Sequence, residues 1–180
     1  MVSETLSQGF LEAQEGPEDE KYMKMALQEA VEALQEGEVP VGAVLVMGGR
    51  VLATAHNRCE KLRDPTAHAE MLALREACSQ VKNYRLLGGR LYVTVEPCLM
   101  CAGALHLARL ERVVYGCADP KAGAMGSRYS IHSEGKLNHT LEVRSGVLET
   151  ECGLLMSSFF RQLRQRPKKF TDTERWPSLA

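Results

Sequence analysis

Residues 91–118 read LYVTVEPCLMCAGALHLARLERVVYGCA, and the pattern of this segment predicts the fold class. An apolar strand pattern over residues 91–95 ends at Pro97, and the Ala- and Leu-rich residues 98–110 then favour a helix. Residues 112–118 return to a β-branched, apolar strand pattern. A strand, a helix and a second strand in this order predict two parallel strands, with the helix on one face of their sheet.

The rest of the chain extends this unit in both directions. The predicted helices are residues 18–36, 68–78, 98–110 and 149–165, and the predicted strands are residues 41–47, 50–55, 91–95, 112–118 and 141–147. Gly48-Gly49 joins the first two strands as a hairpin. We therefore expect an α/β fold, a three-layer α/β/α sandwich with a mixed five-stranded sheet.

The ends of the chain and one internal connection differ from this regular pattern. Residues 1–17 have weak periodicity and are predicted to be a mobile acidic N-terminal tail. One domain then covers residues 18–166, and residues 167–180 form a C-terminal tail. The Gly- and Ser-rich connection over residues 119–139 is long for a compact domain, so we expect it to be functional or to contain a short helix.

Composition limits the class of protein. A chain of 180 residues with 44% hydrophobic and 25% charged residues is typical of a single globular domain and excludes a disordered chain, a collagen-like fibre and a small disulfide scaffold. No apolar run reaches 18 residues, so no membrane span is expected. The first 30 residues lack the pattern of a secretory signal, which predicts a cytoplasmic protein with reduced cysteines.

Charge is distributed unevenly along the chain. The net charge of the whole chain is −1, but residues 1–20 carry six acidic and no basic side chains, which leaves +5 on the remaining residues. A basic group lies near the C-terminus and comprises Arg161, Arg164, Arg166, Lys168 and Lys169. Such a run is usually a solvated helix end, but on a basic body it can also contact a polyanion.

Two short motifs at predicted helix starts bring together metal-binding side chains. Cys98 and Cys101 are three residues apart, so a helix places both thiols on one face, and the helix dipole favours their thiolate forms. His68 supplies a nitrogen ligand. Zinc accepts Cys and His ligands together, and three protein ligands leave a position for a water whose pKa falls to about 7.

Glu70 follows His68 by two residues, about 200° around a helix, so the two side chains do not share a face. It can reach the attacking water from another direction and transfer its proton. The C-x-x-C pair alone leaves zinc and thioredoxin-like redox sites equally open. The remaining cysteines and histidines have no metal-ligand spacing and are expected to fill space.

The joint order H-x-E followed by P-C-x-x-C resembles the zinc-dependent cytidine and deoxycytidylate deaminase superfamily. The similarity covers most of residues 20–165. Its main segments are VPVGAV (39–44), HNR (56–58), DPTAHAE (64–70), LYVTVEPC (91–98) and MCAGA (100–104). Three further segments resemble the tRNA-specific adenosine deaminase family within it, namely GAMGS (123–127), LNH (137–139) and FFR (159–161).

This resemblance implies a zinc-dependent deaminase domain over residues 18–166, with one Zn²⁺ per subunit on His68, Cys98 and Cys101. A zinc-bound hydroxide attacks C6 of adenine, while Glu70 moves its proton to N1 and helps the amine leave as ammonia. The product is inosine. The implied target is the wobble adenosine of a tRNA anticodon, in bacteria that of an arginine tRNA, and a base in a loop is already unpaired.

The resemblance also implies contacts to the RNA and to a second subunit. Asn57 contacts the base, the loop with Asp119 and Lys121 borders the pocket, and Arg161 with the basic tail holds phosphates of the anticodon stem-loop. The helix that starts at Cys98 helps to form a homodimer. Two features depart from the family pattern: the acidic N-terminal extension, and Thr140 in place of a basic residue.

Three other functions compete with this interpretation. A deaminase of free guanine, cytosine or cytidine would keep the zinc motif but would not need a basic tail. A non-enzymatic RNA-binding subunit on the same fold would usually lack the carboxylate that is present here as Glu70. A redox protein would cycle Cys98 and Cys101 between thiols and a disulfide, which stoichiometric zinc would exclude.

Overall fold

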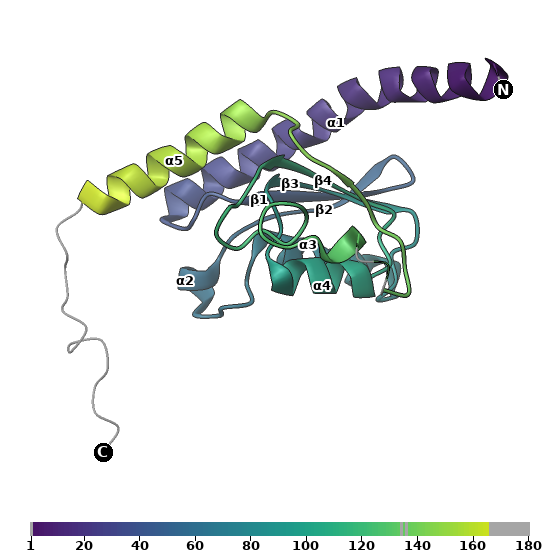
Figure 1. The fold of residues 1–180 in the computed structure, drawn as a ribbon. Helices are drawn as coiled ribbons and strands as arrows, with labels where there is room; N and C mark the ends of the chain where they lie inside the picture. Colours follow the sequence, from purple (N-terminus) through teal and green to yellow (C-terminus); the bar gives the residue numbers. More distant parts are fainter. Residues whose placement is uncertain (1, 134, 136, 166–180) are drawn as a thin grey trace.

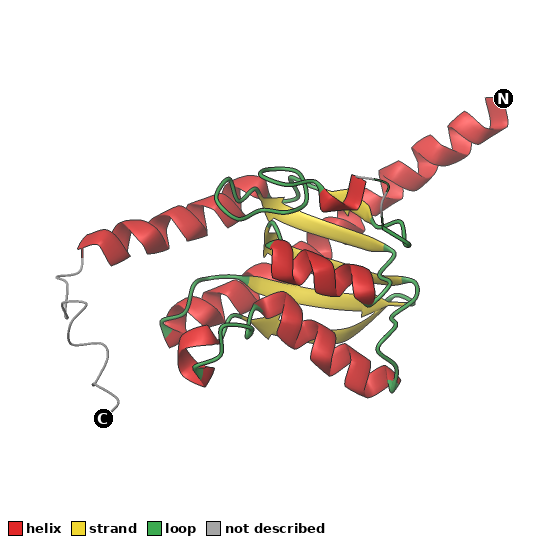
Figure 2. Cartoon of the chain, turned by 60° about the horizontal axis from the view of Figure 1, so that its bottom comes forward, coloured by secondary structure: helices red, strands yellow, loops and turns green. Residues whose placement is uncertain are grey.

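The computed structural model describes residues 2–133, 135 and 137–165, which form three layers (Figures 1 and 2). The strands are β1 (Gly42–Met47), β2 (Arg50–His56), β3 (Gly89–Val95), β4 (Arg112–Cys117) and β5 (Glu142–Arg144). The helices are α1 (Val2–Glu36), α2 (Cys59–Leu62), α3 (Ala69–Val81), α4 (Leu99–Leu107), α5 (Glu149–Gln165) and the short 3₁₀ helix η1 (Ile131–Ser133). The predicted α/β/α sandwich with a mixed five-stranded sheet is confirmed.

The sheet has the strand order β2-β1-β3-β4-β5. β1 is antiparallel to both β2 and β3, whereas β3, β4 and β5 run parallel to one another. The predicted parallel pairing across residues 91–118 is therefore confirmed, with Val93 opposite Tyr115. Because parallel strands end at the same edge of a sheet, the segments that follow β3 and β4 emerge side by side.

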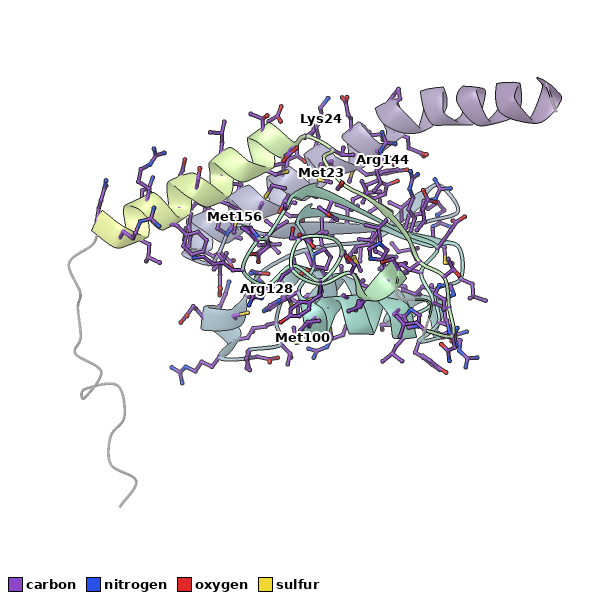
Figure 3. All side chains as sticks on the ribbon, in the orientation of Figure 1. Met23, Lys24, Met100, Arg128, Arg144 and Met156 are labelled. Atoms are coloured by element: carbon purple, nitrogen blue, oxygen red, sulfur yellow. The ribbon has the colours of Figure 1, made fainter. Side chains whose placement is uncertain are left out.

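Each face of the sheet is covered by its own helices. β1 is buried on both sides: Ala43 and Leu45 pack in the core beneath α3 and α4, whereas Val44 and Val46 pack with α1. Figure 3 shows Met23 and Arg144 on the α1 side and Met100 on the α4 side. α1 lies so close to β1 that a Cβ on Gly42 would come within 2.0 Å of the carbonyl oxygen of Ala26. Burial on both faces explains the nearly continuous apolar strands.

A buried ionic cluster joins α1 to the sheet. Asp19 is only 1% exposed. Its carboxylate accepts hydrogen bonds from the Tyr92 hydroxyl at 2.9 Å and from Arg144 at 2.7 Å, and Arg112 lies 3.8 Å away. The cluster connects α1 with β3, β4 and β5. One of the acidic residues near the N-terminus thus belongs to the core of the domain.

The start of α1 corrects one prediction. We predicted a helix from residue 18, but α1 begins at Val2 and continues through Pro17. Residues 2–15 are rich in Leu, Glu, Gln and Ala, which have high helix propensity, and their end of α1 projects beyond the sheet (Figure 1). A helical segment outside the layers needs no apolar stripe, so periodicity did not reveal it. The mobility of residues 1–17 stays a prediction.

The remaining differences are small. The segment between β2 and α3 contains the single turn α2, and the connection over residues 119–139 contains η1, as anticipated. α5 has the predicted bounds, whereas β5 is shorter than the predicted strand. The predicted tail over residues 167–180 lies outside the described residues. Within the described part of the chain, no helix has both the length and the apolar character needed to cross a membrane.

Candidate active site

The candidate site lies where α3 and α4 begin. His68 is the N-cap residue of α3 and Cys98 is the N-cap residue of α4, and neither side chain caps its own helix. Instead, these side chains meet each other. His68 Nδ1 lies 3.7 Å from Cys98 Sγ and 3.5 Å from Cys101 Sγ. The structure therefore brings together the three side chains that the sequence predicted as metal ligands.

The distances between these side chains fit one zinc ion. Tetrahedral zinc with ordinary Zn–N and Zn–S bonds places a nitrogen and a sulfur ligand about 3.6 Å apart. The ligand atoms of His68, Cys98 and Cys101 all lie within 4.8 Å of one another and could hold a metal ion. Two sulfurs and an imidazole are ligands that zinc accepts together, and three protein ligands leave its fourth position to a water or a substrate.

The three candidate ligand side chains also shift one another's pKa values. A hydrogen bond from the Cys101 thiol is the main cause that lowers the pKa of Cys98 to about 4. The same bond and burial raise the pKa of Cys101. The hydrogen bond to Cys98 raises the pKa of His68 above its ordinary value. The geometry therefore favours a thiolate at Cys98, which is the form that binds metals.

Glu70 lies in the first turn of α3, directly beside this cluster. Its side chain is buried, with 4% exposed, and burial raises the pKa of its carboxyl group. His68 and Cys98 act on this group through their charges, and the Cys101 thiol acts on it through a hydrogen bond. A buried carboxyl next to a candidate metal ion is suited to carry a proton between water and a substrate.

Asn57 is positioned by the start of α3. Its side-chain oxygen accepts a hydrogen bond of 2.8 Å from the N–H of Ala69, so Asn57 caps the helix in place of His68. Its side chain is 8% exposed. The cap explains how the His68 ring is left to face the two sulfurs. The base contact that the resemblance implies for Asn57 stays a prediction, whereas the structure shows this capping role.

Glu38 anchors the segment that follows Asn57. This glutamate is 2% exposed and accepts hydrogen bonds from the N–H groups of Glu60 and Lys61 at 3.2 and 2.8 Å. Glu36 pairs with Lys61 and Arg58 on the surface. The C-terminal end of α1 therefore fixes the loop on one side of the candidate site, which the sequence analysis did not foresee.

Glu96 anchors the loop that follows β4. It lies between β3 and Pro97, is 3% exposed, and accepts hydrogen bonds from Asp119, Met125 and Ser127. Burial would raise the pKa of Glu96, but these hydrogen bonds outweigh burial and hold the pKa below its ordinary value. The sequence analysis assigned no role to Glu96. The only sequence signal for such a role is the position of this acidic residue between a buried strand and Pro97-Cys98.

The structure places the predicted RNA-contacting residues in two regions. Asp119 and Lys121 lie just after β4, and the Asp119 carboxylate accepts a hydrogen bond of 2.9 Å from the N–H of Lys121. Gly123 of the same loop pairs with Cys98 in an isolated β-bridge, so this loop adjoins the metal centre. Arg161 instead lies on the exposed end of α5, where it contacts Ser158 at 3.1 Å, outside the cluster around His68.

Comparison with known proteins agrees with this geometry. The model of the cytidine and deoxycytidylate deaminase zinc-binding region matches residues 17–117. The tRNA-specific adenosine deaminase of Bacillus subtilis is 52% identical over 151 residues, which cover 84% of this chain and 94% of the relative.

Solved structures show the same relationship. A structure from studies of A-to-I editing by tRNA:A34 deaminases at the wobble position of transfer RNA is 46% identical, with a TM-score of 0.73, and the match covers 75% of this chain and 98% of that one. A guanine deaminase from Bacillus subtilis is 31% identical, with a TM-score of 0.54, over 84% of this chain and 97% of that one. The chain therefore belongs to the tRNA-specific adenosine deaminase family of the zinc-binding cytidine and deoxycytidylate deaminases.

Proposed function

We propose that this chain is a hydrolase that converts adenosine to inosine at the wobble position of a tRNA anticodon and releases ammonia. The observation that carries this proposal is the cluster of His68, Cys98 and Cys101 with the buried Glu70 beside it. The family relationship supports adenosine in tRNA as the substrate. Within tRNA, we propose an arginine tRNA as the target.

Each side chain of the candidate site has a role in this reaction. His68, Cys98 and Cys101 hold Zn²⁺, which when bound activates water for attack at neutral pH. Glu70 takes a proton from the attacking water and delivers it to N1 of adenine, and after water has added at C6 it moves the proton of the new C6 hydroxyl to the amine. Water adds at C6, the C6–N6 bond breaks, and ammonia leaves. Asn57 contacts the base while its oxygen keeps α3 in place.

The RNA backbone is held by basic side chains outside the cluster. Lys121 is exposed on the loop next to Cys98, and Arg161 and Arg164 are exposed on α5. Contacts of this kind release counterions from the nucleic acid, so affinity falls as salt rises. A deaminase of free guanine would need no such contacts, and its turnover would be insensitive to salt.

We further propose that the chain acts as a cytoplasmic homodimer with one zinc ion per subunit. α4 carries two exposed leucines, Leu99 and Leu107, which are 49% and 70% exposed. His106 of the same helix is buried, and neither ring nitrogen has a hydrogen-bond partner among the described residues. A second copy packed against α4 would cover the leucines. Mass measurement in solution by light scattering tests the dimer.

Inosine formation in a synthetic anticodon stem-loop tests the proposed reaction. The zinc-loaded parent protein is expected to convert a wobble adenosine, and the Glu70→Ala variant is expected not to. Glu76→Ala, a change of an exposed glutamate on α3, is the matched control and should retain conversion. A stem-loop with adenosine only in the paired stem should remain unmodified. Absence of inosine with zinc-loaded parent protein, together with turnover of free guanine, would contradict the proposal.

A further inference from the structure

The segment after β4 closes over one buried carboxylate. Glu96 Oε2 accepts a hydrogen bond of 3.0 Å from the N–H of Asp119. Its Oε1 accepts hydrogen bonds from the N–H groups of Met125 and Ser127 at 2.9 and 3.0 Å, and the Ser127 hydroxyl also donates to Oε2. Both ends of the loop over residues 119–127 are thus held by a single side chain.

Gly123 shows how closely this loop passes over the carboxylate. A Cβ at this position would come within 2.3 Å of Glu96 Oε2 and within 2.6 Å of the Asp119 carbonyl oxygen. Gly123 also bridges to Cys98, and the N–H of Ala124 donates to the Pro97 carbonyl at 2.9 Å. The loop is therefore fixed both to Glu96 and to the backbone around Cys98.

The same loop carries Lys121, an exposed cation two residues after Asp119. The Asp119 carboxylate accepts hydrogen bonds from the N–H groups of Lys121 and Ala122, which forms a tight turn. Since the N–H of Asp119 is held by Glu96, the position of this turn depends on the Glu96 carboxylate. A glutamine there would present an N–H₂ group to one of the N–H donors, and the two donors would repel each other.

We propose that Glu96 is a positioning residue that holds the loop over residues 119–127 beside the metal centre and so determines how tightly the RNA is bound. The proposal rests on the proposed function, because the loop is expected to contact the substrate. Both carboxylate oxygens of Glu96 accept hydrogen bonds from the loop, so we infer that this residue acts through the loop rather than on the reacting atoms. Loss of its anchoring should therefore weaken RNA binding more than it slows the chemical step.

Steady-state kinetics of Glu96→Gln on the wobble-adenosine stem-loop test this inference. We expect KM to rise by roughly tenfold or more, with kcat within about threefold of the parent value. Zinc content should remain at the parent level. The matched control is Glu111→Gln, an exposed carboxylate just before β4 at the opposite end of the sheet, and it should leave both constants unchanged. Equal KM values for Glu96→Gln and the parent would overturn the proposal.

A double-mutant cycle separates loop positioning from a general loss of stability. Lys121→Ala should raise KM in the parent but add little in the Glu96→Gln background, because the loop is already displaced. Additive effects would contradict action through the loop. Gly123→Ala leaves Glu96 in place but prevents close approach of the loop, so it should reproduce the rise in KM even if Glu96→Gln does not fold.

Hydrogen exchange provides a readout that is independent of activity. The amides of Asp119, Met125 and Ser127 should be protected in the parent and should exchange faster in Glu96→Gln, whereas amides in β3 keep their protection. Unchanged exchange at these three amides would refute the anchoring role. A parent protein that forms no inosine would contradict the proposed function alone, since the exchange measurement still decides whether Glu96 holds the loop.

Discussion

Glu70 and Glu96 are two buried glutamates that lie next to the candidate metal ligands in the sequence, Glu70 two residues after His68 and Glu96 two residues before Cys98. Glu70 begins α3 and is 4% exposed, and Glu96 follows β3 and is 3% exposed. Burial raises the pKa of Glu70. The same effect acts on Glu96, but hydrogen bonds from Ser127, Asp119 and Met125 outweigh burial and lower its pKa.

The difference shows that burial alone does not determine what a carboxylate does. A glutamate that accepts several N–H groups is held as an anion and cannot easily take up a proton, so it is suited to fix backbone. A glutamate with fewer donors exchanges protons more readily and is suited to catalysis. The two residues should therefore respond in opposite ways to the same substitution.

The largest effect is expected from Glu70→Gln. Removal of the proton carrier should reduce the rate of inosine formation on the order of 10³-fold, because glutamine cannot accept and return a proton. Stability should be unchanged or slightly higher, since a buried carboxyl is replaced by a neutral group of the same size. Single-turnover kinetics and urea unfolding of the zinc-loaded variant measure both quantities. Near-parent activity of this variant would contradict the role of Glu70 as the proton carrier.

Glu96→Gln should lower the stability of the fold but largely preserve the rate of inosine formation. The loss of charge and the new donor–donor contact should lower the free energy of unfolding by about 1–3 kcal/mol, because N–H groups of the loop lose their charged acceptor. Activity should persist at saturating RNA. Urea unfolding measured beside Glu111→Gln checks this value. A stability equal to that of the parent would show that the hydrogen bonds to Glu96 make no net contribution to the free energy of unfolding.

Metal removal should abolish the reaction that depends on Glu70 but should preserve the hydrogen bonds of Glu96. Chelation of zinc should abolish inosine formation, and added Zn²⁺ should restore it, because His68, Cys98 and Cys101 act through the ion. The hydrogen bonds of Glu96 are formed with protein groups only. Amide protection at Met125 should therefore survive chelation, and its complete loss would indicate that the ion, rather than Glu96, holds the loop.

The smallest effect is expected from Ser127→Ala. This change removes the hydroxyl that donates to Glu96 Oε2 but leaves the backbone N–H of residue 127 on Oε1. The expected cost is about 1 kcal/mol of unfolding free energy, typical of one hydrogen bond. A cost as large as that of Glu96→Gln would mean that the serine hydroxyl, and not the backbone, dominates the anchor.

The sequence allowed the ligand set to be predicted because His68, Cys98 and Cys101 lie in local motifs at helix starts. Residue spacing within one helix fixes which side chains share a face. The role of Glu96 could not be predicted in this way. Its partners are 23 to 31 residues away, and they approach it only because β3 and β4 end at the same edge of the sheet.

Two further features could not be predicted from the sequence, for related reasons. Asn57 caps α3 by accepting a hydrogen bond from Ala69, which is 12 residues away in the sequence. No sequence pattern in the intervening loop predicts that contact. The start of α1 at Val2 was missed because its first part projects from the sheet and has no apolar stripe to detect. Periodicity therefore identified the elements that pack in the layers, whereas contacts between distant loops required the three-dimensional structure.

Single-turnover inosine formation at saturating stem-loop RNA distinguishes the proton carrier from the positioning residue, with zinc-loaded parent, Glu70→Gln and Glu96→Gln compared at equal zinc content. We expect rapid conversion by the parent, conversion within about threefold of that rate by Glu96→Gln, and almost none by Glu70→Gln. Conversion by Glu70→Gln at the rate of the parent would contradict the assignment of Glu70 as the proton carrier.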